Sequence, residues 1–170
     1  MLEADNPVPA QTPRQSVFAV KLPISYRTDE RLTYAEYVRF LIDSDLGAQY
    51  PRQRFEERIP KLLANSSVVV TARSEGRLVG VLMAVTDFVY YMHVTDLGVV
   101  RDFERQGIGS QLIEHAIVAA GGSDDIMTTL IASEEAFAFY EKNGFKNHVA
   151  MMYRSKVEWE DFVVDESFLP

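Results

Sequence analysis

A glycine-containing loop in the second half of the chain is the segment best suited to bind an anion. It runs from Glu104 to Ser110 with the sequence Glu-Arg-Gln-Gly-Ile-Gly-Ser. An apolar, β-branched segment precedes it and a helical pattern begins at Gly107, so the loop joins a strand to a helix. Free N–H groups and the positive dipole end of a helix N-terminus attract phosphate, and glycines let it approach the backbone. The loop therefore predicts a phosphate or pyrophosphate site.

Three other glycine-loop motifs do not fit this segment. The dinucleotide fingerprint requires three glycines in the first strand–helix unit, whereas only Gly107 and Gly109 are present, late in the chain. The phosphate loop of NTPases requires a lysine before the Ser/Thr, but Ser110 follows a glycine. The nucleophile elbow, G-x-S-x-G, is absent. A tight turn with glycines needed only for packing is the structural alternative. In the anion-binding interpretation, Arg101 and Arg105 could add direct positive charge.

Apolar periodicity places the loop in an alternating α/β pattern. Strands are expected over 17–26, 67–73, 78–85, 89–100, 126–132 and 145–154, and helices over 34–43, 51–64, 107–120 and 134–143. Thr33 is expected to cap the first helix, Pro60 to break or kink the second, and Gly98 to mark a bulge or a close backbone approach. The order contains a three-stranded meander followed by strand–helix–strand steps. It predicts an α/β fold with a mixed, mostly antiparallel central sheet and flanking helices.

Two segments together resemble the GNAT superfamily of N-acetyltransferases. Residues 97–113, Leu-Gly-Val-Val-Arg-Asp-Phe-Glu-Arg-Gln-Gly-Ile-Gly-Ser-Gln-Leu-Ile, resemble motif A, usually written [QR]-x-x-G-x-[GA]. Residues 132–145, Ala-Ser-Glu-Glu-Ala-Phe-Ala-Phe-Tyr-Glu-Lys-Asn-Gly-Phe, resemble motif B. A helix and a strand separate the two motifs, as the family requires, and the resemblance covers roughly 68–152. It implies the acyl-CoA N-acyltransferase fold.

The sequence departs from these motifs at two positions. Glu104 stands where motif A usually has Gln or Arg, and Ser133 stands where motif B usually has Asn. A glutamate pointing inward would place negative charge near the pyrophosphate. We therefore expect Glu104 to point to solvent, with Arg105 and Gln106 near the phosphates.

The resemblance implies direct transfer of an acetyl group from acetyl-CoA to a primary amine. Tyr140 matches the motif B tyrosine that protonates the leaving thiolate, and a phenol with a pKa of about 10 is protonated at neutral pH. A core aromatic is the alternative for Tyr140. Main-chain contacts along the strand before the loop are implied for Leu97, Gly98 and Val99. The implied pyrophosphate cradle comprises Arg105, Gln106, Gly107, Ile108, Gly109 and Ser110.

The general base has two candidates on the strand over 89–100. Strict alternation would place His93 and Thr95 on one face and Asp96 and Gly98 on the other. Asp96 lies next to the implied thioester position, where an acidic residue is a frequent base in this family. His93 has the better intrinsic pKa. The alternatives are structural roles for both residues, with a water chain carrying the proton to solvent.

The acceptor pocket is expected between the first two helices and this strand. Three tyrosines could line it, and two aspartates could anchor a cationic amine: Tyr34, Tyr37, Tyr50, Asp43 and Asp45. The plainer interpretation makes the tyrosines core residues and the aspartates a solvated helix end. The acceptor itself is not identified. Another acyl-CoA donor, a catalytically silent CoA-binding module and a protein-interaction domain also remain open.

The composition excludes several other functions. The 170 residues suffice for one domain with a full core, and the net charge of −8 argues against partners such as nucleic acid or an anionic membrane. With no cysteine, disulfides and thiolate chemistry are excluded. The three histidines lie too far apart in sequence to suggest a metal site.

The sequence also gives expectations for organisation and location. Prolines mark residues 1–15 as a flexible tail, 16–156 form the GNAT-like domain, and 157–170 form an acidic C-terminal segment of undecided packing. No apolar run reaches the ~20 residues of a membrane helix. The N-terminus lacks a signal-peptide pattern. We therefore expect a cytoplasmic monomer or homodimer.

Overall fold

The computed structural model describes residues 23–148 and 162–170. The expected tail over 1–15, most of the expected strand over 17–26 and the larger part of the one over 145–154 lie outside these ranges. Residues 145–148, which are described, do not form a strand.

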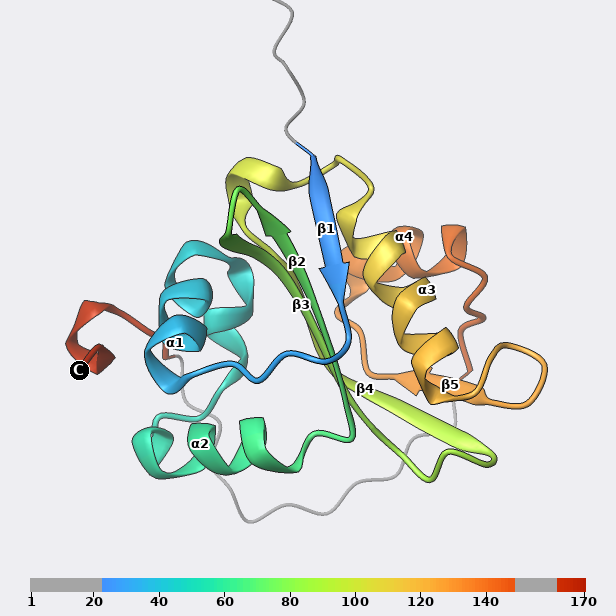
Figure 1. The fold of residues 1–170 in the computed structure, drawn as a ribbon, viewed down its shortest axis with the longest axis horizontal. Helices are drawn as coiled ribbons and strands as arrows, with labels where there is room; N and C mark the ends of the chain where they lie inside the picture. The colour runs from blue at the N-terminus through green and yellow to red at the C-terminus, as the bar shows by residue number, and fades with distance from the viewer. Residues whose placement is uncertain (1–22, 149–161) are drawn as a thin grey trace, which may run out of the picture.

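A five-stranded mixed sheet forms the centre of the domain (Figure 1). Its strands lie in the order β1-β2-β3-β4-β5, antiparallel throughout except for the parallel pair β4–β5. This confirms the mixed, mostly antiparallel sheet predicted from the element order. The strands are β1 (Ile24–Arg27), β2 (Val68–Ser74), β3 (Arg77–Thr86), β4 (Tyr91–Val99) and β5 (Met127–Leu130).

Helices cover both faces of the sheet (Figure 1). One face carries α1 (Tyr34–Asp43), the short helix η1 (Asp45–Gln49) and α2 (Phe55–Asn65). The other carries α3 (Ile108–Ala120) and α4 (Phe137–Lys142). Each face buries its own apolar cluster, and alternate residues of the strands contribute to the two clusters because strand side chains have a period of two.

Local sequence signals explain two of the element boundaries. The Thr33 hydroxyl accepts a hydrogen bond from the Glu36 N–H at 3.2 Å, which confirms the predicted cap of α1. Glu75 and Gly76 have φ values of 49° and 83°, which the two-residue turn between β2 and β3 requires at both positions. The antiparallel pairing of β2 and β3, expected as part of the three-stranded meander, is therefore confirmed.

Of the two outcomes expected for Pro60, a break or a kink, the break does not occur. Helix α2 starts at Phe55, later than expected, and continues through Pro60 to Asn65. Pro60 is exposed, so water can reach the Glu56 carbonyl that loses its intrahelical partner. The apolar side chains of Phe55 and Ile59 are buried and fix the helix against the sheet.

Replacing Pro60 with alanine is expected to stabilise the protein. Alanine restores the missing N–H and removes the ring clash, a gain of about 1–3 kcal/mol after the smaller entropic benefit of proline in the unfolded chain is subtracted. Urea unfolding of Pro60→Ala measures this, with Lys61→Ala as the exposed neighbour that already has its N–H. A Pro60→Ala variant no more stable than wild type would contradict this expectation.

The structure places a β-bulge at Thr95 and none at Gly98. Asp96 pairs with Met83 and Val94 with Ala84, so Thr95 is an extra residue on β4. A Cβ on Gly98 would lie 3.2 Å from side-chain atoms of Leu46 and Phe40. The close approach predicted at Gly98 therefore exists, but α1 and η1 are its cause.

The C-terminal segment packs against α1 and α2 (Figure 1). Val164 is buried, and the rings of Phe162 and Phe168 lie edge-on to Phe55 at 5.9 and 5.0 Å. Glu166 accepts two hydrogen bonds from Arg39, at 2.6 and 2.9 Å. The described part of the segment is thus an integral part of this face.

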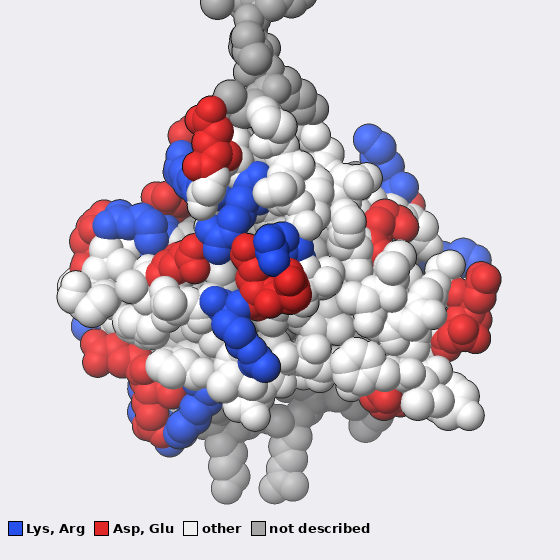
Figure 2. Space-filling model, viewed as in Figure 1, with Lys and Arg blue, Asp and Glu red and all other residues white. Residues whose placement is uncertain are grey.

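Charged side chains of both signs are interspersed on the face seen in Figure 2. Ion pairs form within the described part of the chain, for example between Arg73 and both Glu30 and Glu36, each at 2.8 Å. Much of the remaining surface in this view is uncharged (Figure 2). The net negative charge of the chain is therefore not concentrated in one patch of this face.

None of the helices in the described part of the chain has the length and apolar character needed to cross a membrane. Over the same residues, no group of three His, Asp or Glu side chains is placed to hold a metal ion.

Candidate functional site

The glycine loop leads into α3 with its backbone N–H groups available. The first hydrogen bond at this end runs from the Gln111 N–H to the Gly107 carbonyl, at 3.2 Å. The N–H groups of Ile108, Gly109 and Ser110 precede it and have no intrahelical acceptor. Gly107 has a φ of 84°, and a Cβ built on it would meet no atom within 4 Å. The helix start is therefore open to an anion.

The second glycine of the loop has a packing role. A Cβ on Gly109 would lie 3.0 Å from the Phe139 ring of α4. Gly109 thus allows α4 to pack against the first turn of α3. Of the two interpretations of the glycines, the anion site fits Gly107 and the packing turn fits Gly109.

The side chains of the loop differ in their surroundings. Glu104 and Arg105 are exposed, and Arg105 has a φ of 57°. Gln106 is half-buried and its amide donates to the Asp102 carbonyl at 3.4 Å. Within this loop, Arg105 is the cation exposed next to the helix start.

Arg101 does not have the role predicted for it. Its guanidinium donates to Asp45 Oδ1 at 2.8 Å and to the carbonyls of Ile42 and Ser44 at 3.0 and 2.9 Å. These bonds tie the end of β4 to the C-terminus of α1 and direct the charge away from the loop. The predicted amine anchors are also engaged, Asp45 by Arg101 and Asp43 by Arg77 at 3.1 Å.

Strand β4 has a free edge where it approaches the loop. It pairs with β5 only over residues 91–94, and within the described residues no β5 pairing continues beyond Leu130, which leaves a gap in the hydrogen-bond ladder. The Val100 N–H donates to the Val79 carbonyl of β3 at 2.9 Å. Because N–H directions alternate along a strand, those of Val99 and Leu97 point to the opposite side, where β5 has ended. Backbone donors therefore line this gap and continue into the loop.

Tyr140 lies on α4, the helix that packs against the first turn of α3. Its ring lies edge-on to those of Phe139 and Phe145, at 5.1 and 5.6 Å, and Phe139 in turn covers Gly109. Burial raises the pKa of the Tyr140 hydroxyl. The phenol is therefore protonated at neutral pH, as a proton donor must be.

The bulge at Thr95 changes which face Asp96 occupies. Met92 and Val94 lie in the cluster under α3, so His93 between them points to the α1–α2 face. Asp96 is also on the α1–α2 face, where it contacts Tyr50. The expectation that His93 and Asp96 lie on opposite faces is wrong, because the extra residue shifts the alternation.

Asp96 is buried in a chain of hydroxyl groups. Its side chain accepts a hydrogen bond from Tyr50 at Oδ1 and lies 2.7 Å from the Thr95 hydroxyl at Oδ2. The Tyr50 hydroxyl lies 2.8 Å from that of Tyr37. Burial raises the pKa of Asp96, against the lowering effect of the bonds from Tyr50 and Thr95. Burial likewise raises the pKa of both tyrosines.

His93 is half-buried beside β5. Its Nδ1 lies 3.0 Å from the Thr129 hydroxyl, which donates to the Met92 carbonyl at 3.3 Å. The single proton of the Thr129 hydroxyl is used in the bond to Met92, so the hydroxyl must accept from His93. A neutral His93 therefore carries its hydrogen on Nδ1. Nε2 is then the basic nitrogen.

Sequence reasoning did not associate Thr95, Tyr37 and Tyr50 with Asp96. The tyrosines were expected to line an acceptor pocket, and Thr95 was expected to lie on the face opposite Asp96. A bulge leaves no period-two signature, and tyrosines separated from Asp96 by more than forty residues give no local signal.

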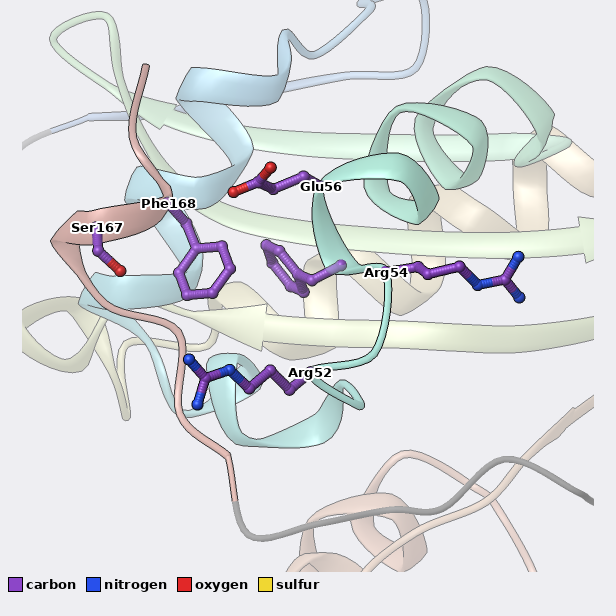
Figure 3. A pocket seen from close by; sticks show the side chains of 6 residues that line it. Arg52, Arg54, Glu56, Ser167 and Phe168 are labelled. Atoms are coloured by element: carbon purple, nitrogen blue, oxygen red, sulfur yellow. The ribbon is translucent and has the colours of Figure 1, made fainter.

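A shallow pocket of about 390 Å³ lies between the start of α2 and the C-terminal segment (Figure 3). Arg52 extends toward that segment and Arg54 extends away from it (Figure 3). Phe55 lines the pocket and lies edge-on to the Tyr50 ring at 6.0 Å. The pocket is therefore separated from Asp96 by two aromatic side chains.

Comparison with known proteins adds a family assignment. A family model described as an acetyltransferase (GNAT) domain matches residues 33–165. This range contains the loop, the free edge of β4, Asp96 and Tyr140. No curated protein matches the chain.

Solved structures share the fold. A candidate acetyltransferase from Deinococcus radiodurans R1 is 26% identical with a TM-score of 0.61, over 77% of this chain and 87% of that one. A GNAT family acetyltransferase from Streptococcus pneumoniae TIGR4 is 22% identical with a TM-score of 0.62, over 79% and 99%. An aminoglycoside acetyltransferase from an uncultured soil metagenomic sample, solved with sisomicin, is 21% identical with a TM-score of 0.55, over 79% and 95%.

Proposed function

Because this chain belongs to the GNAT acetyltransferase family, we propose that it transfers an acetyl group from acetyl-CoA directly to a primary amine. The observation that carries this proposal is the continuity of backbone donors from the gap beside β4 to the N-terminus of α3. Such a path suits a ligand with a thioester at one end and a pyrophosphate further along. The acyl-CoA supplies an activated acyl group with a thiolate leaving group.

The loop would hold the pyrophosphate. The N–H groups of Ile108, Gly109 and Ser110 provide donors, and the α3 dipole favours negative charge at this end. The exposed cation of Arg105 adds charge beside them. Gln106 borders the same turn. The residues present fit the group because the space beside Gly107 is open.

The free edge of β4 would orient the acyl group. The N–H groups of Leu97 and Val99 point into the gap, where they can stabilise negative charge that develops on a thioester oxygen. Gly98 lies between them and lets α1 pack closely behind the strand. Since these are main-chain contacts, side-chain substitutions at Leu97 and Val99 would affect them little.

Proton transfer would involve both sides of the sheet. Tyr140 is our candidate for the acid that protonates the leaving thiolate, since its phenol is protonated and its helix packs on the loop. The amine must lose a proton before it can attack, and of the two bases expected from the sequence, His93 and Asp96, we take His93 as our candidate on the α1–α2 face. Of the two, His93 is the more accessible, because Asp96 is only 4% exposed.

A thiol-release assay with acetyl-CoA and a library of primary amines tests this function. We expect release of free thiol that depends on both the protein and an amine. The library should include aminoglycosides and amino sugars, because proteins of this fold include an aminoglycoside acetyltransferase and a glucosamine-6-phosphate N-acetyltransferase. Replacing acetyl-CoA with longer acyl-CoA thioesters tests the donor. Binding of acetyl-CoA without thiol release from any donor would instead indicate a non-catalytic CoA-binding module.

A further inference from the structure

We propose that Asp96 is a neutral, protonated carboxylic acid in the folded protein and acts as a positioning residue for the β4 bulge. The protonation of Asp96 is independent of the proposed function. The consequence that Asp96 is not the base rests on that function.

The surroundings of Asp96 favour a neutral group. The side chain is 4% exposed and lies between β4, the aromatic residues of α1 and Tyr50, which follows η1. Its neighbours with titratable side chains are Tyr37 and Tyr50, and among the described residues no cation contributes to its titration. Burying a carboxylate without a cation is costly, so the proton is retained to higher pH.

The hydrogen-bond pattern supplies the stronger argument. Four contacts form one chain, which joins Tyr37 to Tyr50, Tyr50 to Asp96, Asp96 to Thr95, and Thr95 to the Met83 carbonyl at 3.2 Å. Each hydrogen bond needs one proton, and the three hydroxyl groups supply three. With an ionised Asp96, the Thr95 hydroxyl can donate to the carboxylate or to the carbonyl, but not to both.

A proton on Asp96 Oδ2 completes the chain. The acid then donates to the Thr95 hydroxyl, and Thr95 donates to the Met83 carbonyl on β3. At the other oxygen, Oδ1 accepts from Tyr50, and Tyr50 accepts from Tyr37. Four protons then serve four contacts. Burial raises the pKa of Asp96, in agreement with this count.

This arrangement has a structural consequence for β4. Thr95 is the extra residue of the bulge, so no ladder bond on β3 fixes it. The proton on Asp96 directs its hydroxyl to β3 and so holds the bulge in one geometry. The bulge in turn sets the direction of the N–H groups of Leu97 and Val99. Asp96 therefore acts on the thioester site through the backbone.

The decisive variant is Asp96→Asn. An asparagine amide can donate to Thr95 and accept from Tyr50, so it reproduces all four contacts of the neutral acid. A carboxyl group whose pKa is raised by folding contributes stability that is greatest below its unfolded pKa of about 3.9 and is lost as pH rises toward the folded value. We therefore expect Asp96→Asn to gain stability relative to wild type as pH rises through that window. Asp96→Ala, which cannot form the chain, should be less stable than Asp96→Asn at every pH.

The protonation state is read directly by NMR of the wild-type protein. The side-chain carboxyl carbon of Asp96 is assigned as the carboxyl signal that is missing from Asp96→Asn. As the pH is raised, it should keep the chemical shift of a protonated acid well above the pH range in which ordinary aspartates titrate. A carboxyl carbon that titrates with the ordinary aspartates would overturn the proposal. This measurement does not depend on acyl transfer, so failure of the proposed function leaves it valid.

Turnover tests the positioning role. Asp96→Asn should retain the wild-type turnover and its pH profile, since the contacts persist and no base is lost. Loss of a general base typically lowers turnover by about 10²–10⁴-fold. A folded Asp96→Asn variant with a loss of that size would show that Asp96 is the base and would contradict the positioning role.

Discussion

Replacing Gly107 with glutamate is expected to abolish the rise in melting temperature that acetyl-CoA gives to the wild-type protein. At a ligand concentration near 100 times Kd, mass action stabilises the wild type by about 2.7 kcal/mol, or roughly 5–10 °C for a domain of this size. No atom lies within 4 Å of a Cβ at this position, so the new side chain takes the space in front of α3. Its carboxylate then competes with phosphate for the free N–H groups and repels it. Thermal unfolding with and without acetyl-CoA measures the effect.

Gly122→Glu is the matched control for this variant. Gly122 also has a positive φ, of 105°, and a Cβ on it would likewise meet nothing within 4 Å. The substitution adds the same charge and similar backbone strain at the opposite end of α3, about 20 Å away. We expect a lower melting temperature from both variants, but a retained acetyl-CoA shift only in Gly122→Glu. A normal shift in Gly107→Glu would mean that this loop does not bind the pyrophosphate.

Tyr140→Phe is expected to lower turnover by about 10²-fold or more while leaving the acetyl-CoA shift intact, because general acids typically contribute 10²–10⁴-fold. The phenylalanine keeps the ring packing against Phe139 and Phe145 and removes only the proton donor. Steady-state thiol release measures turnover, and thermal shift measures binding.

Tyr26→Phe controls for loss of a half-buried hydroxyl. Tyr26 packs on the same cluster from β1, and burial also raises its pKa. Its substitution should leave turnover unchanged.

Burial raises the pKa of Tyr140 above the ordinary value of about 10, so an alkaline loss of activity due to Tyr140 should lie above that pH and be absent in Tyr140→Phe. Full activity in Tyr140→Phe would exclude it as the acid.

Local patterns were sufficient to predict most of the sheet and its helices. The cap at Thr33, the turn at Glu75 and Gly76 and the glycine at the start of α3 each act over a few residues. Such signals are visible in a sequence because the residue and its structural effect are adjacent. The mixed sheet followed from them, since a meander is antiparallel and the later strand–helix–strand step permits a parallel pair.

The errors came from contacts that are distant in sequence. Pro60 remains helical because the neighbouring apolar residues of α2 are fixed by packing. Arg101 was expected to face the anion, but its guanidinium bonds to the end of α1, more than fifty residues earlier. Thr95 occupies a bulge that depends on the register with β3. This one extra residue moves each later residue of β4 to the face opposite the one that strict alternation predicts. In each case the decisive partner lies on another element.

The Arg101 contacts also have an evolutionary consequence. Two of the three acceptors are backbone carbonyls, of Ile42 and Ser44, which any side chain at those positions would still provide. The third acceptor is the exposed carboxylate of Asp45. Only a guanidinium presents donors in several fixed directions at once, so lysine is a poor substitute. Among related sequences, position 101 should therefore change slowly, while the exposed position 45 can diverge without loss of the two carbonyl contacts.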